Sequence, residues 1–132
     1  MTKPPAPFVV YDTTMPAKVR ICRTYKFSQQ AAAMFQAHLP QSRAWFANLH
    51  EFIVRLATGQ PLSSEAFRQE GPGYAFRSGR IRFYGAYSAK HKGHFVLSHP
   101  TYKAKQKLSE ADVQKIEQCM RDFDALDTPP KV

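Results

Sequence analysis

Residues 73–99 read GYAFRSGRIRFYGAYSAKHKGHFVLSH and contain three strand-like runs. The runs cover 73–77, 80–87 and 93–99. Ser78-Gly79 separates the first two and is a tight-turn signal, because glycine adopts the backbone conformation that short hairpin turns need. A longer, basic loop at 88–92 precedes the third run. The stretch therefore predicts three meandering antiparallel strands.

The middle run alternates between an apolar and a polar face, as side chains do along a strand. The apolar face holds Ile81, Phe83 and Tyr87. The polar face holds Arg80, Arg82 and Tyr84. We expect the apolar face to pack on helices and the polar face to present arginine to solvent or to a ligand.

Two helices are predicted before the meander. Ser28 suits the N-cap of a helix that runs to about residue 38, and Pro40 suits the first turn of the next helix. That second helix ends at Gly59. Its apolar residues keep helical spacing: Trp45, Leu49, Phe52, Ile53 and Leu56. A third helix follows the meander at 109–123, where Ser109 and Asp112 make a capping box with Asp in place of Glu or Gln.

The remaining segments complete one domain. Residues 18–26 predict a first strand, and residues 59–72 a polar connection. The order strand, helix, helix, three strands, helix indicates a two-layer α+β fold, in which a small antiparallel-rich sheet packs against a helical hairpin and a C-terminal helix. We assign this domain to residues 18–125, with a proline-rich N-terminal arm at 1–17 and a C-terminal tail at 126–132.

The chain is strongly basic around the meander. Between Glu70 and Glu110 it has no acidic residue and eight lysines and arginines, and its net charge is +9. Aromatic residues interleave with these bases, so the segment is a folded surface rather than a disordered basic tail. Basic side chains beside aromatic rings suit phosphates and unstacked bases. We therefore expect a surface that faces RNA, DNA or a ribosome.

Other features narrow the class of protein. No stretch approaches the roughly 20 apolar residues of a membrane span, and the N-terminus lacks the apolar region of a signal peptide. Cys22 and Cys119 fit no metal-ligand spacing, and the histidines are scattered. We interpret both cysteines as reduced thiols in a cytoplasmic protein, with a disulfide between them as the alternative. We expect no metal and no small-molecule cofactor.

Three segments resemble the RelE/ParE toxin superfamily, and most nearly its HigB-like branch, which occurs in bacterial toxin–antitoxin systems and in phages. The segments are Arg77-Ser-Gly-Arg-Ile-Arg82-Phe, Phe95-Val-Leu-Ser-His99 and Lys103-Ala-Lys105-Gln-Lys107-Leu-Ser. Pro100-Thr101-Tyr102 departs from the Gly-Phe-basic step that is usual in the family. The resemblance implies a β-α-α-β-β-β-α fold.

The resemblance also implies a metal-independent, ribosome-dependent mRNA endonuclease. In that reaction the 2′-hydroxyl of the substrate attacks the adjacent phosphodiester. The enzyme supplies a base, an acid and cations that stabilise the phosphorane charge. The implied partners are the ribosome, mRNA and a cognate antitoxin protein that covers the basic cleft.

Five residues are candidates for the catalytic site. Arg82 and Arg77 suit phosphate stabilisation, although Arg77 also fits a solvated turn. His99 suits acid–base chemistry near neutral pH, but strand alternation puts it with apolar residues and also fits a hydrogen-bonded histidine at the edge of the core. Tyr102 suits base stacking or proton transfer, with simple packing as the alternative, and Lys103 suits a phosphate contact.

A second set of basic residues is predicted to bind RNA. Lys105 and Lys107 follow Lys103 at alternate positions, so an extended backbone would project all three to one side. The complete RNA-binding set is Arg80, Lys90, Lys92, Lys105 and Lys107.

Two other functions remain open. A ParE-like protein would share the fold, lack enzyme activity and inhibit DNA gyrase; the histidine and lysines at the end of the last strand favour the RNase. Outside this superfamily, three basic strands and a helix fit a module that reads a DNA groove with its sheet. That module would bind DNA with a steep salt dependence, and it leaves the helical hairpin unexplained.

Overall fold

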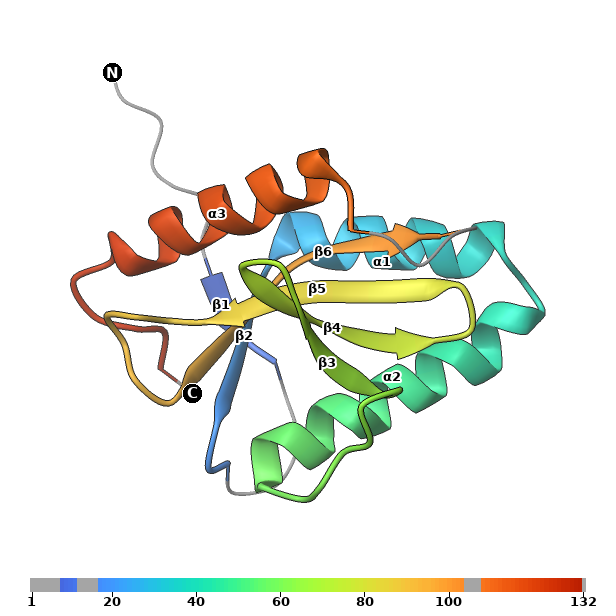
Figure 1. Ribbon diagram of the computed structural model, residues 1–132, viewed down its shortest axis with the longest axis horizontal. Helices are drawn as coiled ribbons and strands as arrows, with labels where there is room; N and C mark the ends of the chain where they lie inside the picture. The colour runs from blue at the N-terminus through green and yellow to red at the C-terminus, as the bar shows by residue number, and fades with distance from the viewer. Residues whose placement is uncertain (1–7, 12–16, 104–107, 132) are drawn as a thin grey trace.

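A mixed six-stranded sheet forms the centre of the protein in a computed structural model, which describes residues 8–11, 17–103 and 108–131 (Figure 1). The strands are β1 (Phe8–Val10), β2 (Arg20–Thr24), β3 (Phe67–Glu70), β4 (Gly73–Ser78), β5 (Ile81–Tyr87) and β6 (His94–Tyr102). The helices are α1 (Tyr25–Ala37), α2 (Gln41–Thr58) and α3 (Glu110–Asp124). The strand order is β1-β2-β6-β5-β4-β3. This arrangement confirms the predicted α+β class, the helical hairpin and the C-terminal helix.

Helices cover both faces of the sheet. On one face, Phe27 of α1 and Leu49 of α2 belong to the same buried cluster as Phe76 of β4. On the other face, Ile116 of α3 is buried with Tyr84 of β5. The protein therefore has three layers, and the expectation of two layers is wrong. The apolar stripe of α3 needs a surface of its own, because the helical hairpin already occupies the first face.

The sequence pattern does not predict two of the strands. β1 lies in the expected N-terminal arm and pairs antiparallel with β2, and Phe8 is buried beside Phe123 of α3, with ring centroids 5.1 Å apart. β3 lies in the expected polar connection and pairs antiparallel with β4. Gly71, at φ +54°, and Pro72 form the turn between β3 and β4. The segments predicted to be an N-terminal arm and a polar connection therefore each contain a strand, and these strands extend the sheet at both edges.

β2 runs parallel to β6, with Ile21 opposite Phe95. The neighbouring residue Cys22 is buried, and Cys119 of α3 packs against the same cluster. Both cysteines are free thiols, as predicted. Within the ranges given above, no helix combines the length and the hydropathy needed to cross a bilayer.

A register shift between β5 and β6 reverses the expected orientation of one site residue. Tyr84 is opposite His99, whereas the next residue, Gly85, is opposite Leu97, so Ser98 is an extra residue in β6. Such a bulge shifts the alternation of side chains by one position. His99 therefore lies on the α3 face beside Tyr84, with ring centroids 5.3 Å apart. The prediction from strict alternation, that His99 shares a face with the apolar residues of the strand, is therefore wrong.

We expect Gly85→Ala to destabilise the protein by about 3 kcal/mol, the upper end of what overpacking usually costs. A Cβ at this position would lie 2.3 Å from the carbonyl oxygen of Val96 and 2.7 Å from the ring of Phe95. Urea unfolding measures the change. Gly93→Ala is the matched control, because its Cβ meets no atom within 4 Å and only the positive φ opposes the substitution. Equal stability of the two variants would contradict the close packing at Gly85.

Candidate functional site

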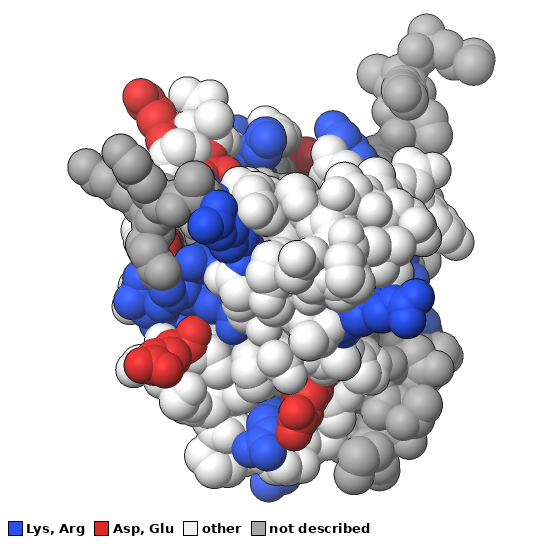
Figure 2. Space-filling view, turned by 90° about the vertical axis from the view of Figure 1, so that its right-hand side faces the viewer, with Lys and Arg blue, Asp and Glu red and all other residues white. Residues whose placement is uncertain are grey.

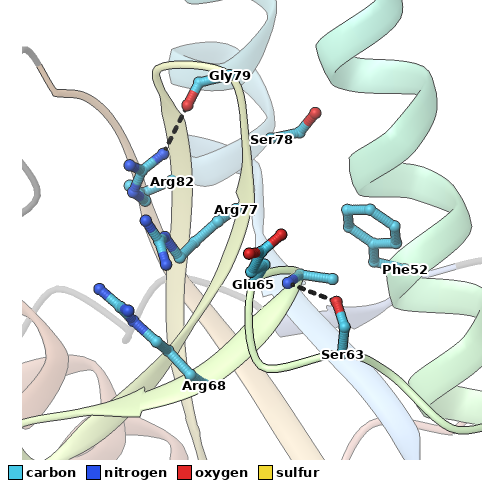
Figure 3. A pocket seen from close by; sticks show the side chains of 9 residues that line it. Phe52, Ser63, Glu65, Arg68, Arg77, Ser78, Gly79 and Arg82 are labelled. Carbon is cyan, nitrogen blue, oxygen red and sulfur yellow. Dashed lines mark hydrogen bonds between the residues drawn. The ribbon is translucent and has the colours of Figure 1, made fainter.

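Three arginines from three adjacent strands lie on the same face of the sheet. Arg77 of β4 is opposite Arg82 of β5, and Arg68 of β3 is opposite Ala75, two residues before Arg77. Side chains two residues apart point to the same face, and neighbouring strands lie about 4.8 Å apart, so the three side chains gather. Figure 3 shows them one above the other. We call Arg68, Arg77 and Arg82 the arginine cluster.

The arginine cluster forms one wall of a cavity of about 580 Å³. Residues of α2 and of the loop between α2 and β3 line the cavity from the other side of β4, and the β4–β5 turn lies at one end (Figure 3). These further lining residues are Phe52, Ser63, Glu65, Ala66, Ser78 and Gly79. α3 packs mainly on β5 and β6. The cavity therefore lies towards the β3 edge of the sheet, where arginine side chains meet the loop that precedes β3.

Arg82 is held in place by the backbone of the β4–β5 turn. Its Nη1 donates hydrogen bonds to the carbonyl oxygens of Gly79, at 2.9 Å, and Ile81, at 3.0 Å. The residue is only 3% exposed, so of the two expectations for this polar face, solvent or a ligand, open exposure to solvent does not apply to Arg82. Burial and the neighbouring Arg77 both lower the pKa of Arg82. A bound anion would relieve the repulsion between these two cations.

Arg77 retains an unused hydrogen-bond donor. Its Nε is buried, and no acceptor in the described part of the chain bonds to it. The hydroxyl of Tyr84, in the next row on the same face, is likewise buried without a partner there. Leaving such a group unsatisfied costs roughly 1–3 kcal/mol, so buried donors normally have acceptors. Because Arg77 lines the cavity, its free donor favours a bound group that accepts hydrogen bonds, such as a phosphate oxygen.

One carboxylate partly balances the arginine cluster. Glu70 Oε2 lies 3.7 Å from Arg68 Nε. The three positive charges of the arginine cluster outnumber the negative charge of this carboxylate, so the surface around the cluster is positively charged. Arginine binds phosphate through planar, paired donors. The geometry of the cluster therefore suits a phosphodiester better than a neutral ligand.

Asp112 organises the first turn of α3. Its Oδ2 accepts hydrogen bonds from the backbone N–H and hydroxyl of Ser109, and the Ser109 hydroxyl caps the Asp112 N–H in return. This confirms the predicted capping box. Lys103 Nζ lies 2.6 Å from Asp112 Oδ2, and His99 Nε2 lies 2.9 Å from Oδ1. Burial alone would raise the pKa of Asp112, but the hydrogen bonds from Lys103, Ser109 and His99 hold it well below its usual range.

His99 is a buried, neutral member of this network. Burial lowers its pKa, the contact with Asp112 opposes this, and the nearby Lys115 and Lys103 cations add to the lowering, so the pKa lies below its ordinary value. The neutral ring carries its proton on Nε2 and donates to Asp112, while Nδ1 accepts from the Ser98 hydroxyl, 2.9 Å away. His99 is 5% exposed. The structure thus matches the alternative of a hydrogen-bonded histidine at the edge of the core.

Tyr102 lies on the opposite face of the sheet from the arginine cluster. It is paired with Ile81, whereas Arg82 is paired with Thr101. The Tyr102 ring stacks on His38, at the end of α1, with centroids 3.9 Å apart and planes within 4°. Tyr102 is 38% exposed, so one side of this ring pair remains open to solvent. The structure does not bring Tyr102 together with the other catalytic candidates.

The predicted RNA-binding residues are divided between two ends of the sheet. Arg80 is exposed at the β4–β5 turn, next to the cavity. Lys90 and Lys92 are exposed in the loop at the other end of β5, where Lys90 Nζ donates to the carbonyl of Leu126. Lys105 and Lys107 lie outside the described residues. At the end of the molecule that carries the β4–β5 turn, lysines and arginines flank a broad area without charged side chains (Figure 2).

The sequence matches no protein-family model and no curated protein. Over residues 8–11, 17–103 and 108–131, no three His, Cys, Asp or Glu side chains come together as possible metal ligands. The arginine cluster and its cavity are the features that a proposal must explain.

Sequence reasoning missed Arg68 and the role of Asp112. Arg68 was hidden because the hairpin that carries it was interpreted as a connection, although Gly71-Pro72 is a turn signal between residues that pair. Asp112 was recognised as a helix cap, but its contacts with His99 and Lys103 join residues from another element. No local pattern reports such contacts.

We expect the stability of the protein to fall as the pH drops below about 6.5, the ordinary pKa of histidine. Because the pKa of His99 is lower in the folded chain, the unfolded chain takes up this proton first, and each pH unit removes up to about 1.4 kcal/mol. Urea unfolding between about pH 7.5 and pH 5 measures the loss. His99→Gln, which can still donate to Asp112, should lack this component. An unchanged pH dependence in the variant would contradict the assignment.

Proposed function

We propose that this protein is the toxin of a toxin–antitoxin module, of the RelE-like and most nearly HigB-like kind, and cleaves mRNA on the ribosome without a metal ion. The observation that carries the proposal is the arginine cluster, which faces a cavity at one edge of the sheet. The helical hairpin on one face and the C-terminal helix on the other support the same resemblance. The proposed partners are mRNA, the ribosome and a cognate antitoxin protein that covers the basic cavity, and the proposed location of the protein is the cytoplasm.

The arginine cluster supplies the charge stabilisation that this reaction needs. When the 2′-hydroxyl attacks the phosphodiester, negative charge develops on the phosphorane oxygens, and fixed guanidinium groups stabilise it. Arg82 is preorganised by its two carbonyl contacts. Arg77 adds an unused buried donor beside it. Arg68 would hold a neighbouring phosphate of the same strand.

His99 lies one row away from these arginines in the register of the sheet, on the same face. Its row, Tyr84–His99, is next to the row Arg82–Thr101. A neutral imidazole can accept a proton, which suits a general base. In this proposal Asp112 orients the ring and Lys103 contributes positive charge.

A non-enzymatic, ParE-like inhibitor of DNA gyrase is the second candidate, and a specific observation favours it. His99 and Lys103 both bind Asp112, and Tyr102 lies on the other face, so few acid–base groups point into the cavity. A module that reads DNA with its sheet is less favoured, because helices pack on both faces of the sheet.

Induced expression in a bacterial host tests the proposal. Growth is followed together with primer-extension maps of an abundant mRNA, with and without a block of translation. Growth arrest with cuts that depend on translation supports the ribosome-dependent RNase. Arrest with intact mRNA supports the gyrase inhibitor, and unimpaired growth with intact mRNA contradicts both toxin proposals.

A further inference from the structure

β3 is the last strand at one edge of the sheet, and part of its backbone faces away from β4 (Figure 1). The N–H of Arg77 donates to the carbonyl of Ala66, so the residues at even positions of β3 direct their N–H and C=O groups toward β4. Phe67 and Gln69 alternate with them and direct these groups outward. The Phe67 N–H donates to the Ser63 carbonyl, and over the described residues no bond reaches the N–H or C=O of Gln69. This edge can therefore pair with a further strand.

On one face, the edge carries a positive charge. Arg68 is the outermost member of the arginine cluster, and its side chain is 41% exposed. Glu70 lies on the same face, but its side chain is only 9% exposed, so Arg68 supplies most of the charge that an incoming strand would meet. Opposite charges on facing residues of neighbouring strands stabilise the pairing, and like charges destabilise it. A carboxylate on the incoming strand is therefore favoured beside Arg68.

On the other face, the edge is aromatic. Phe67 stacks on Tyr74 of β4, with ring centroids 5.1 Å apart and planes within 8°. Tyr74 also contacts the ring of Tyr87, at a centroid distance of 5.3 Å, and Tyr87 is 42% exposed. Phe67 and Tyr74 are only partly buried against the core. An incoming strand is therefore favoured if its side chains on this face are apolar.

We propose that the β3 edge binds an extended segment of a partner protein in which acidic and apolar residues alternate. The segment adds a strand to the six-stranded sheet. Successive side chains of a strand point to opposite faces, so the acidic ones lie beside Arg68 and the apolar ones beside Phe67. In strand addition of this kind, backbone hydrogen bonds provide affinity and alternate side chains provide specificity. The inference goes beyond the proposed function, since it needs neither RNA nor a ribosome.

A second copy of this chain fits the edge less well than an acidic partner. It would bring another arginine cluster to the same edge, and each chain has a net charge of +9. Repulsion between like charges opposes such self-association at short and long range. The edge also borders the cavity that Arg68 lines, so an acidic segment docked here would lie next to that anion site.

Binding of synthetic peptides to the purified full-length protein tests the inference. The probe is a fluorescent peptide in which glutamate and valine alternate over about six residues, the usual length of a strand. One comparison peptide has the same composition, with its glutamates and valines in separate blocks. A second has lysine in place of glutamate. We expect the alternating acidic peptide to bind about tenfold more tightly than either comparison, because it alone matches both faces of the edge.

Two pairs of variants separate backbone pairing from charge. Gln69→Pro removes an outward N–H at an edge position where proline is tolerated, and it should weaken binding of the acidic peptide about tenfold. Gln69→Ala keeps the N–H and should bind as the unmodified protein does. Arg68→Glu should transfer the preference to the lysine peptide. Arg43→Glu makes the same change of net charge at an exposed position on α2 and should not.

Thermal melting shows which variants are folded. The inference is overturned if the alternating acidic peptide does not bind, or if the three peptides bind equally to the unmodified protein. Undiminished binding by folded Gln69→Pro, or an unchanged preference in folded Arg68→Glu, would also overturn it. Equal effects of Arg68→Glu and Arg43→Glu would assign the binding to net charge and exclude a site at β3.

Discussion

Replacing Arg77 with glutamine is expected to slow mRNA cleavage by about 10²–10³-fold and to abolish growth arrest, as removal of one charge-stabilising donor does in comparable sites. Arg77 is the better probe of the arginine cluster because its buried Nε has no acceptor in the described residues. A substitution of Arg82 would be harder to interpret, because its hydrogen bonds to Gly79 and Ile81 also hold the β4–β5 turn, so a loss of cleavage could come from a change in structure. Primer extension on mRNA from induced cells measures the loss of cuts.

The control for Arg77 is Arg43→Gln, which removes the same charge from an exposed position on α2. Thermal melting of both variants shows whether the fold is retained. A folded Arg77→Gln protein that still cuts mRNA and arrests growth would exclude a role for this guanidinium in the reaction. Equal losses in both variants would show that the effect comes from net charge.

Asp112→Ala is expected to destabilise the protein by about 3–5 kcal/mol, the cost of removing one partner from a buried ion pair. The carboxylate is 4% exposed and accepts hydrogen bonds from Lys103, His99 and Ser109. Its removal leaves the Lys103 ammonium half-buried beside α3 without this carboxylate and takes away half of the capping box. Domains of this size have a total stability of about 5–15 kcal/mol, so a large fraction would be lost. Urea unfolding at neutral pH measures it.

Glu117→Ala, on the exposed side of α3, is the comparison and should change stability by no more than about 0.5 kcal/mol. If Asp112→Ala were equally mild, the network at the start of α3 would not hold the helix on the sheet.

Acid should destabilise the unmodified protein through the same carboxylate. Because the pKa of Asp112 is lowered on folding, its contribution is complete above about pH 3.9 and is lost as the pH falls below that value.

The local pattern of residues predicted most elements of the fold correctly. Period-two alternation identified β4, β5 and β6, and helical spacing with caps identified α2 and α3. These features depend on neighbours in the chain, so a sequence reports them directly. β1 and β3 were missed because three- and four-residue strands carry too little alternation to distinguish them from loops. They are stabilised by pairing with β2 and β4, which are separate segments.

The candidate site was predicted only in part. The acid-free basic segment indicated an anion-binding surface, and Arg77 and Arg82 do lie side by side on neighbouring strands. Arg68 joins them because β3 pairs with β4 in one register, and the bulge at Ser98 turns His99 towards α3. Composition and periodicity established the fold class and the charge of the surface, since both are properties of local sequence. Strand register and helix packing decided which charged side chains meet, which are buried and which pair with Asp112. Both bring together residues that are distant in the chain, so local sequence does not report them.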